Sequence, residues 1–95
     1  MNRFDTMETL HLTIKGKVQG VYYRASAKEK GDEINIKGWV KNKMDGNVEA
    51  VASGSKEQIE QFIEWCKKGP KRAMVTEVEV TPLEYQSFPD FKIVK

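Results

Sequence analysis

Apolar and polar residues alternate in several short segments of the chain, which is the pattern of strands with one buried face. These segments are 10–14, 36–41, 48–53, 75–80 and a short last one over 91–94. Pro82 is expected to end the fourth strand. Asp45-Gly46, between the second and third segments, is a strong hairpin signal. The pattern therefore predicts five strands, with the second and third joined by a tight turn.

Two further segments have helical spacing. The first, over 22–33, has an inner face made of Tyr23, Ala27, Gly31 and Ile34. Asn35 suits the left-handed position that ends a helix. The second helix opens at Ser55, which forms a capping box with Gln58, and it stops at Gly69-Pro70. Its apolar face consists of Ile59, Phe62, Ile63 and Cys66.

The resulting order, β-α-β-β-α-β with a short extra C-terminal strand, predicts an α+β protein of the ferredoxin-like, split βαβ type. We expect an antiparallel sheet with both helices on one face. The length of 95 residues predicts one domain, over 8–95, preceded by a loose extension over 1–7. The polar first residues resemble neither a signal peptide nor a membrane anchor. The fold alone does not indicate a function.

Composition and charge narrow the function classes. A net charge of +2 is too small to favour nucleic acid or a membrane through bulk charge, so any attraction for phosphate must be local. Cys66 is the only cysteine, which excludes an intramolecular disulfide and favours a reducing, cytoplasmic environment. With one histidine, His11, and no clustered ligands, we expect neither a metal site nor a cofactor.

The stretch from Gly16 to Arg24 joins the first strand to the first helix and has the parts of an anion site. Its two glycines, Gly16 and Gly20, allow a tight turn in which consecutive N–H groups point at one spot. The helix N-terminus adds free donors, and Arg24 adds a planar fork that suits phosphate oxygens. A tight turn beside a surface arginine is the alternative. The spacing matches neither a Walker A loop nor a dinucleotide-binding fingerprint.

Asn42 ends the second predicted strand. It has the parity of Val40, so its amide should point toward the helix-covered face just where the strand ends. A polar amide there either caps the turn or faces a small cleft. Both interpretations remain open from the residues alone.

Together these stretches resemble the two signature segments of acylphosphatases. The first is Gly16-x-Val18-Gln19-Gly20-Val21-x-Tyr23-Arg24, and the second is Gly38-Trp39-Val40-Lys41-Asn42-x-x-x-Gly46-x-Val48 with Gly54. The resemblance implies the ferredoxin-like fold and hydrolysis of small acyl phosphates. It implies a phosphate cradle with the backbone of Lys17, Val18, Gln19, Gly20, Val21 and Tyr22. It also implies that Arg24 holds the phosphoryl oxygens and that Asn42 holds the attacking water.

The implied reaction suits these few residues. The leaving group of an acyl phosphate is a carboxylate, whose conjugate acid has a pKa of about 4, so it departs without being protonated. Phosphoryl transfer has a loose transition state in most analyses, so the attacking water needs little deprotonation. Positioning and charge stabilisation then suffice.

Two other functions remain as alternatives. The same cradle could serve a non-catalytic phosphate-binding module. RNA binding on the open sheet face requires exposed aromatic residues, whereas the first strand offers His11, Thr13 and Lys15 there. Trp39 and Val51 predict a modest apolar patch on that face, and we expect a monomer with a small-molecule substrate. The cluster of Lys67, Lys68, Lys71 and Arg72 is typical of a solvated loop, with at most a weak attraction for anions.

Overall fold

The computed structural model describes residues 6–95. Its elements are β1 (Met7–Lys17), α1 (Tyr23–Glu33), β2 (Lys37–Asn42), β3 (Val48–Ser55), α2 (Lys56–Lys68), β4 (Met74–Leu83) and β5 (Phe91–Val94). This order confirms the predicted βαββαβ arrangement with an additional C-terminal strand.

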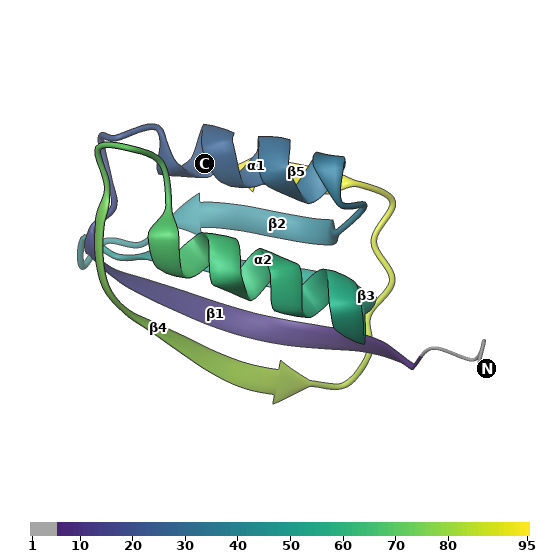
Figure 1. Cartoon of the computed structure of the whole chain (residues 1–95). Helices are drawn as coiled ribbons and strands as arrows, with labels where there is room; N and C mark the ends of the chain where they lie inside the picture. Colours follow the sequence, from purple (N-terminus) through teal and green to yellow (C-terminus); the bar gives the residue numbers. More distant parts are fainter. Residues whose placement is uncertain (1–5) are drawn as a thin grey trace.

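The strands form one sheet in the order β4-β1-β3-β2-β5. β1 pairs antiparallel with β3 and β4, and β2 pairs antiparallel with β3. β5 instead runs parallel to β2, so the sheet is mixed rather than antiparallel throughout. The reason is that β4 and β5 lie at opposite edges, and the chain passes from one edge to the other before β5 begins (Figure 1).

Both helices lie on the same face of the sheet, as predicted (Figure 1). The alternation in β1 places Leu10, Leu12 and Ile14 in the core, at 8%, 0% and 0% exposure. α1 contributes Tyr23, Ala27 and Gly31. α2 contributes Ile59, Phe62 and Cys66. The core therefore fills the space between the helices and the sheet. None of the helices in residues 6–95 has the length and apolar character needed to span a bilayer.

Two boundaries differ from the predicted ones. Met7, expected in a loose extension, is the first residue of β1 and pairs with Ser55, while residues 1–5 lie outside the described part. Pro82 does not end β4, which continues to Leu83. β4 is an edge strand, and Pro82 lies within it opposite Leu10. An edge strand tolerates proline because the missing N–H can fall on the unpaired side.

The predicted helix ends are confirmed. Asn35 has a left-handed backbone, with φ of 63°. The N–H of the following Ile36 donates to the carbonyl of Gly31 at 2.8 Å, as in a Schellman motif. At the start of α2, Ser55 and Gln58 form the reciprocal capping box. These local signals could be read correctly because each involves residues close in sequence.

The connection from β4 to β5 is tied to two buried hydroxyl groups. The side-chain oxygens of Thr9 and Ser53 lie 2.6 Å apart. The Gln86 N–H donates to the Thr9 hydroxyl at 2.8 Å, and the Ser53 hydroxyl lies 2.7 Å from the Gln86 carbonyl.

The apolar patch predicted from Trp39 and Val51 is smaller than expected. Val51 is only 5% exposed, so it does not contribute to an exposed patch.

Candidate active site

The β1–α1 loop, the β2–β3 turn and the α2–β4 loop meet at one end of the sheet (Figure 1). Gly16 starts this arrangement, because the β1–β4 register shifts between Lys15 and Gly16. Its φ of 123° suits glycine, and a Cβ at this position would overlap the carbonyl oxygen of Met74. Only glycine therefore lets β1 pass so close to the start of β4 before the loop begins.

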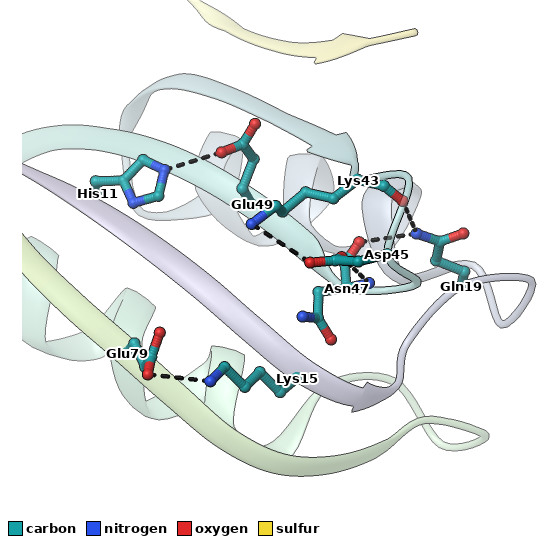
Figure 2. A network of polar contacts seen from close by, with 8 residues as sticks. All are labelled: His11, Lys15, Gln19, Lys43, Asp45, Asn47, Glu49 and Glu79. Carbon is teal, nitrogen blue, oxygen red and sulfur yellow. Dashed lines mark hydrogen bonds and ion pairs between the residues drawn. The ribbon is translucent and has the colours of Figure 1, made fainter.

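The β1–α1 loop is held from two sides. Val18 and Val21 point into the core, at 1% and 5% exposure. The Gln19 side-chain amide donates to the carbonyls of Lys43 and Asn47 in the β2–β3 turn, at 2.7 and 2.8 Å (Figure 2). The loop is thus anchored to both the core and the hairpin through side chains. Its backbone N–H groups are therefore not needed to hold the loop in place.

Two residues of this loop have left-handed backbones, Gly20 with φ of 74° and Tyr22 with φ of 64°. Among the described residues, the N–H groups of Gly20, Val21 and Tyr22 donate to no other backbone carbonyl. Turns of this kind let successive N–H groups converge on an anion. A left-handed tyrosine costs about 1–2 kcal/mol, and such strain is concentrated at functional sites.

Arg24 and Asn42 line the same pocket, of about 530 Å³. Arg24 lies in the first turn of α1, and Asn42 is the last residue of β2. The strand alternation placed the Asn42 side chain on the same face as Val40, and its place in the pocket lining is consistent with that expectation. The full lining comprises Val18, Gly20, Tyr22, Tyr23, Arg24, Ala25, Asn42, Arg72, Ile93 and Lys95.

The other predicted cradle residues do not line this pocket. Lys17 is exposed at the end of β1. Gln19 and Val21 anchor the loop through their side chains, to the hairpin turn and to the core. Of the predicted cradle, the pocket brings together Val18, Gly20 and Tyr22 with Arg24.

Sequence reasoning missed the contribution of the C-terminal part of the chain. Ile93 lies in β5 and Lys95 follows it. The register pairs Lys41 with Val94, so the parallel β5 ends level with Asn42. Arg72 also reaches the pocket, from the α2–β4 loop. Its basic character was visible in the sequence, but its place beside Arg24 depends on where the loop folds.

A larger pocket, of about 620 Å³, involves both helices, but it is chemically unsuited to phosphate. Its three carboxylates, from Glu57, Glu60 and Glu64, outnumber its two lysines, Lys30 and Lys68. The net negative charge of this lining would repel an anion. Among residues 6–95, no Asp or Glu lines the pocket around Arg24 and Asn42. The smaller pocket is therefore the candidate site.

A buried hydrogen bond supports the helix that carries Arg24. The Tyr23 hydroxyl donates to the Cys66 carbonyl at 2.7 Å, which ties the start of α1 to the end of α2. Burial raises the pKa of Tyr23 far above its ordinary value. Burial also raises the pKa of Cys66 to about 12. Cys66 is buried in the core, as its place on the apolar face of the second helix predicts, and its raised pKa favours the neutral thiol.

Comparison with known proteins identifies the family. A family model described as acylphosphatase matches residues 10–93. The chain belongs to the acylphosphatase family. An acylphosphatase of Marinobacter nauticus is 49% identical over 88 residues, which cover 92% of this chain and 96% of that protein.

Solved acylphosphatase structures have the same fold. The Coxiella burnetii acylphosphatase has a TM-score of 0.89 and 38% identity, and covers 93% of each chain. The Bacillus subtilis acylphosphatase has a TM-score of 0.90 and 32% identity, and covers 95% of this chain and 100% of that chain. The chain is thus an acylphosphatase, a hydrolase of acyl phosphates, as its two motifs predict.

Proposed function

We propose that this acylphosphatase transfers the phosphoryl group of a small acyl phosphate directly to water. The β1–α1 loop and Arg24 hold the phosphoryl oxygens, and Asn42 holds the attacking water. The observation that carries the proposal is that Arg24, Asn42 and the loop residues Gly20 and Tyr22 line one pocket.

Arg24 and the loop act on the charge of the phosphoryl group. In the loose transition state negative charge is spread over the equatorial oxygens, and a guanidinium fork can contact two of them. The N–H groups of the loop and the N-terminus of α1 add donors that are already oriented. Because Val18, Val21 and Gln19 hold the loop in place, these donors need little reorganisation during the reaction.

Asn42 acts on the nucleophile. Its amide oxygen accepts a hydrogen bond from water and its NH₂ group donates one, so it can orient a water molecule without taking its proton. Holding that water in line with the leaving group supplies the entropic part of the catalysis. A positioned neutral water is sufficient because little deprotonation is required early in a loose transition state.

The leaving group determines selectivity. The carboxylate of an acyl phosphate departs unprotonated, so the site needs no general acid. A phosphate monoester would instead release an alkoxide, for which the described residues of the pocket lining offer no Asp or Glu side chain as proton donor. We therefore expect good hydrolysis of acyl phosphates and poor hydrolysis of ordinary monoesters.

The direct test is hydrolysis of benzoyl phosphate in the presence of EDTA, with Arg24→Ala and Asn42→Ala beside the wild type. We expect Arg24→Ala to lower kcat/KM by at least about 10²–10³-fold, the effect of removing one strong transition-state donor. Asn42→Ala should lower kcat while inorganic phosphate still binds as a competitive inhibitor. Gln61→Ala, an exposed amide on α2, is the control and should match the wild type.

Several outcomes would overturn the assignment. Full activity of Arg24→Ala would show that Arg24 does not hold the phosphoryl oxygens. Unchanged kcat in Asn42→Ala would show that Asn42 does not hold the attacking water. Phosphate binding without hydrolysis of any acyl phosphate would favour the non-catalytic module. We also propose that the protein is a cytoplasmic monomer that needs no metal ion, which sedimentation and full activity in EDTA would support.

A further inference from the structure

The pocket is lined by two basic side chains besides that of Arg24. Arg24, Arg72 and Lys95 all line it, whereas no Asp or Glu in the described part of the chain does. Within residues 6–95, none of these three side chains forms an ion pair. Outside the pocket, Lys15, Lys28, Lys30, Lys43 and Lys67 each lie within 4 Å of a carboxylate oxygen, and the other described lysines are spread along the chain. What distinguishes the pocket is that three basic side chains line one cavity.

The two additional cations come from other elements than the phosphate cradle. Arg72 lies in the α2–β4 loop and Lys95 follows β5, whereas the cradle and Arg24 belong to the β1–α1 region. When the cradle holds the phosphoryl group, the acyl part must occupy the remainder of the pocket. Ile93 gives this remainder an apolar wall. At about 530 Å³, the pocket is far larger than acetyl phosphate alone requires.

We propose that Arg72, assisted by Lys95, forms a second anion subsite that favours acyl phosphates whose acyl part carries another negative group. Either a carboxylate or a phosphate has the required chemistry. The subsite rests on the proposed function, because it needs the first phosphoryl group in the cradle. A guanidinium is well suited to this purpose, since it binds either anion through two parallel hydrogen bonds.

The test compares three substrates of matched shape: para-carboxybenzoyl, para-phosphonobenzoyl and neutral para-carbamoylbenzoyl phosphate. For the wild type we expect kcat/KM to be higher for the anionic substrates by about two- to five-fold, the effect of an exposed ion pair, and mostly through KM. A larger advantage for the phosphono than for the carboxy substrate would identify phosphate as the preferred group. The advantage should shrink as salt is added, because salt screens exposed charges.

Arg72→Gln should reduce the ratio of kcat/KM for an anionic substrate to kcat/KM for the neutral substrate toward one. Lys95→Gln should reduce this ratio less. Lys71→Gln is the matched control. It removes the same charge one residue away, at an exposed position outside the pocket lining, and should keep the wild-type ratio. Conservative Arg72→Lys should retain part of the preference.

Three results would overturn the subsite. The first is equal kcat/KM of the wild type for anionic and neutral substrates. The second is an equal loss of kcat/KM on all three substrates in Arg72→Gln. The third is an equal change of the anionic-to-neutral kcat/KM ratio in Lys71→Gln and Arg72→Gln. The last two would indicate general electrostatic attraction. Failure of the proposed mechanism is distinguishable, because the wild type would then not hydrolyse the neutral substrate or would not depend on Arg24.

Discussion

Gln19 shows how a side chain that need not touch the substrate can shape the site. Its amide group bridges two carbonyl oxygens of the β2–β3 turn, which immediately follows Asn42 (Figure 2). It therefore links the phosphate cradle to the strand end that carries the proposed water site. The Asn47 carbonyl also accepts the Lys43 N–H at 2.8 Å, so the bridge joins an already closed turn.

Replacing Gln19 with methionine tests this link. The new side chain has similar length but no donors, so both hydrogen bonds are lost. We expect the free energy of unfolding in urea to fall by about 1–3 kcal/mol. We expect kcat/KM for benzoyl phosphate to fall as well, because the cradle and Asn42 are no longer held in register. Gln61→Met, on the exposed face of α2, is the control, and identical results for the two variants would contradict the assignment.

At the scale of elements, α1 is fixed at both ends by left-handed residues. Tyr22 precedes the helix with φ of 64°, and Asn35 follows its last turn with φ of 63°. The N–H of Ser26 donates to the Tyr22 carbonyl at 3.0 Å, so the helix begins directly at the cradle. Because Arg24 lies in that first turn, the geometry of the helix ends contributes to the position of the guanidinium.

The C-terminal end of α1 offers a matched pair of variants. Asn35→Ala places a residue that disfavours the left-handed region at this position, and should lower the free energy of unfolding by about 1 kcal/mol. Asn35→Gly should be as stable as the wild type or slightly more so, because glycine adopts this backbone freely. Urea unfolding of both variants provides the measurement. Equal stability of the two would show that the backbone conformation does not determine the effect.

At the scale of the whole molecule, a buried cluster joins the two helices near the site. The Tyr23 ring lies 5.3 Å from the Trp65 ring between centroids, and its hydroxyl donates to the Cys66 carbonyl. Tyr23 and Cys66 are 2% and 1% exposed. Two groups that titrate in alkaline solution are thus kept neutral in the folded core.

This burial predicts a loss of stability in alkali. Burial raises the pKa of Cys66 from 9.0 to about 12, so above pH 9 the unfolded chain releases this proton while the folded protein keeps it. The unfolded state then binds fewer protons, and the free energy of unfolding falls by up to about 1.4 kcal/mol per pH unit. Tyr23 adds a similar fall above its ordinary pKa of 10.0.

Urea unfolding between neutral and strongly alkaline pH checks this prediction. In Cys66→Ala the alkaline fall in stability should begin about one pH unit later than in the wild type, because Tyr23, with an ordinary pKa of 10.0, is the buried acid that this variant keeps in the cluster. Cys66→Ala should also be less stable at every pH, because it leaves a cavity. Curves of the same shape, merely displaced, would contradict the linkage to Cys66.

The sequence by itself determined the elements, the fold class and the family. Alternation, helical spacing, the Ser55–Gln58 box and the Asn35 signal depend on residues close along the chain, so they can be recognised without the fold. Arg24 and Asn42 were singled out through two motifs. The parity of Asn42 left a turn cap and a small cleft both open, and in the structure Asn42 lines a pocket.

Only the tertiary structure decided how distant segments meet. An alternating pattern does not specify its partner, so the parallel pairing of β5 with β2, and with it the place of Ile93 and Lys95, could not be derived. Gly31, which weakens α1 by about 1 kcal/mol in propensity, lies against Phe91 of β5, where a Cβ would approach the ring to 3.2 Å. Arg72 likewise reaches the site because a loop folds over it. Such contacts depend on which edges and faces remain open after folding.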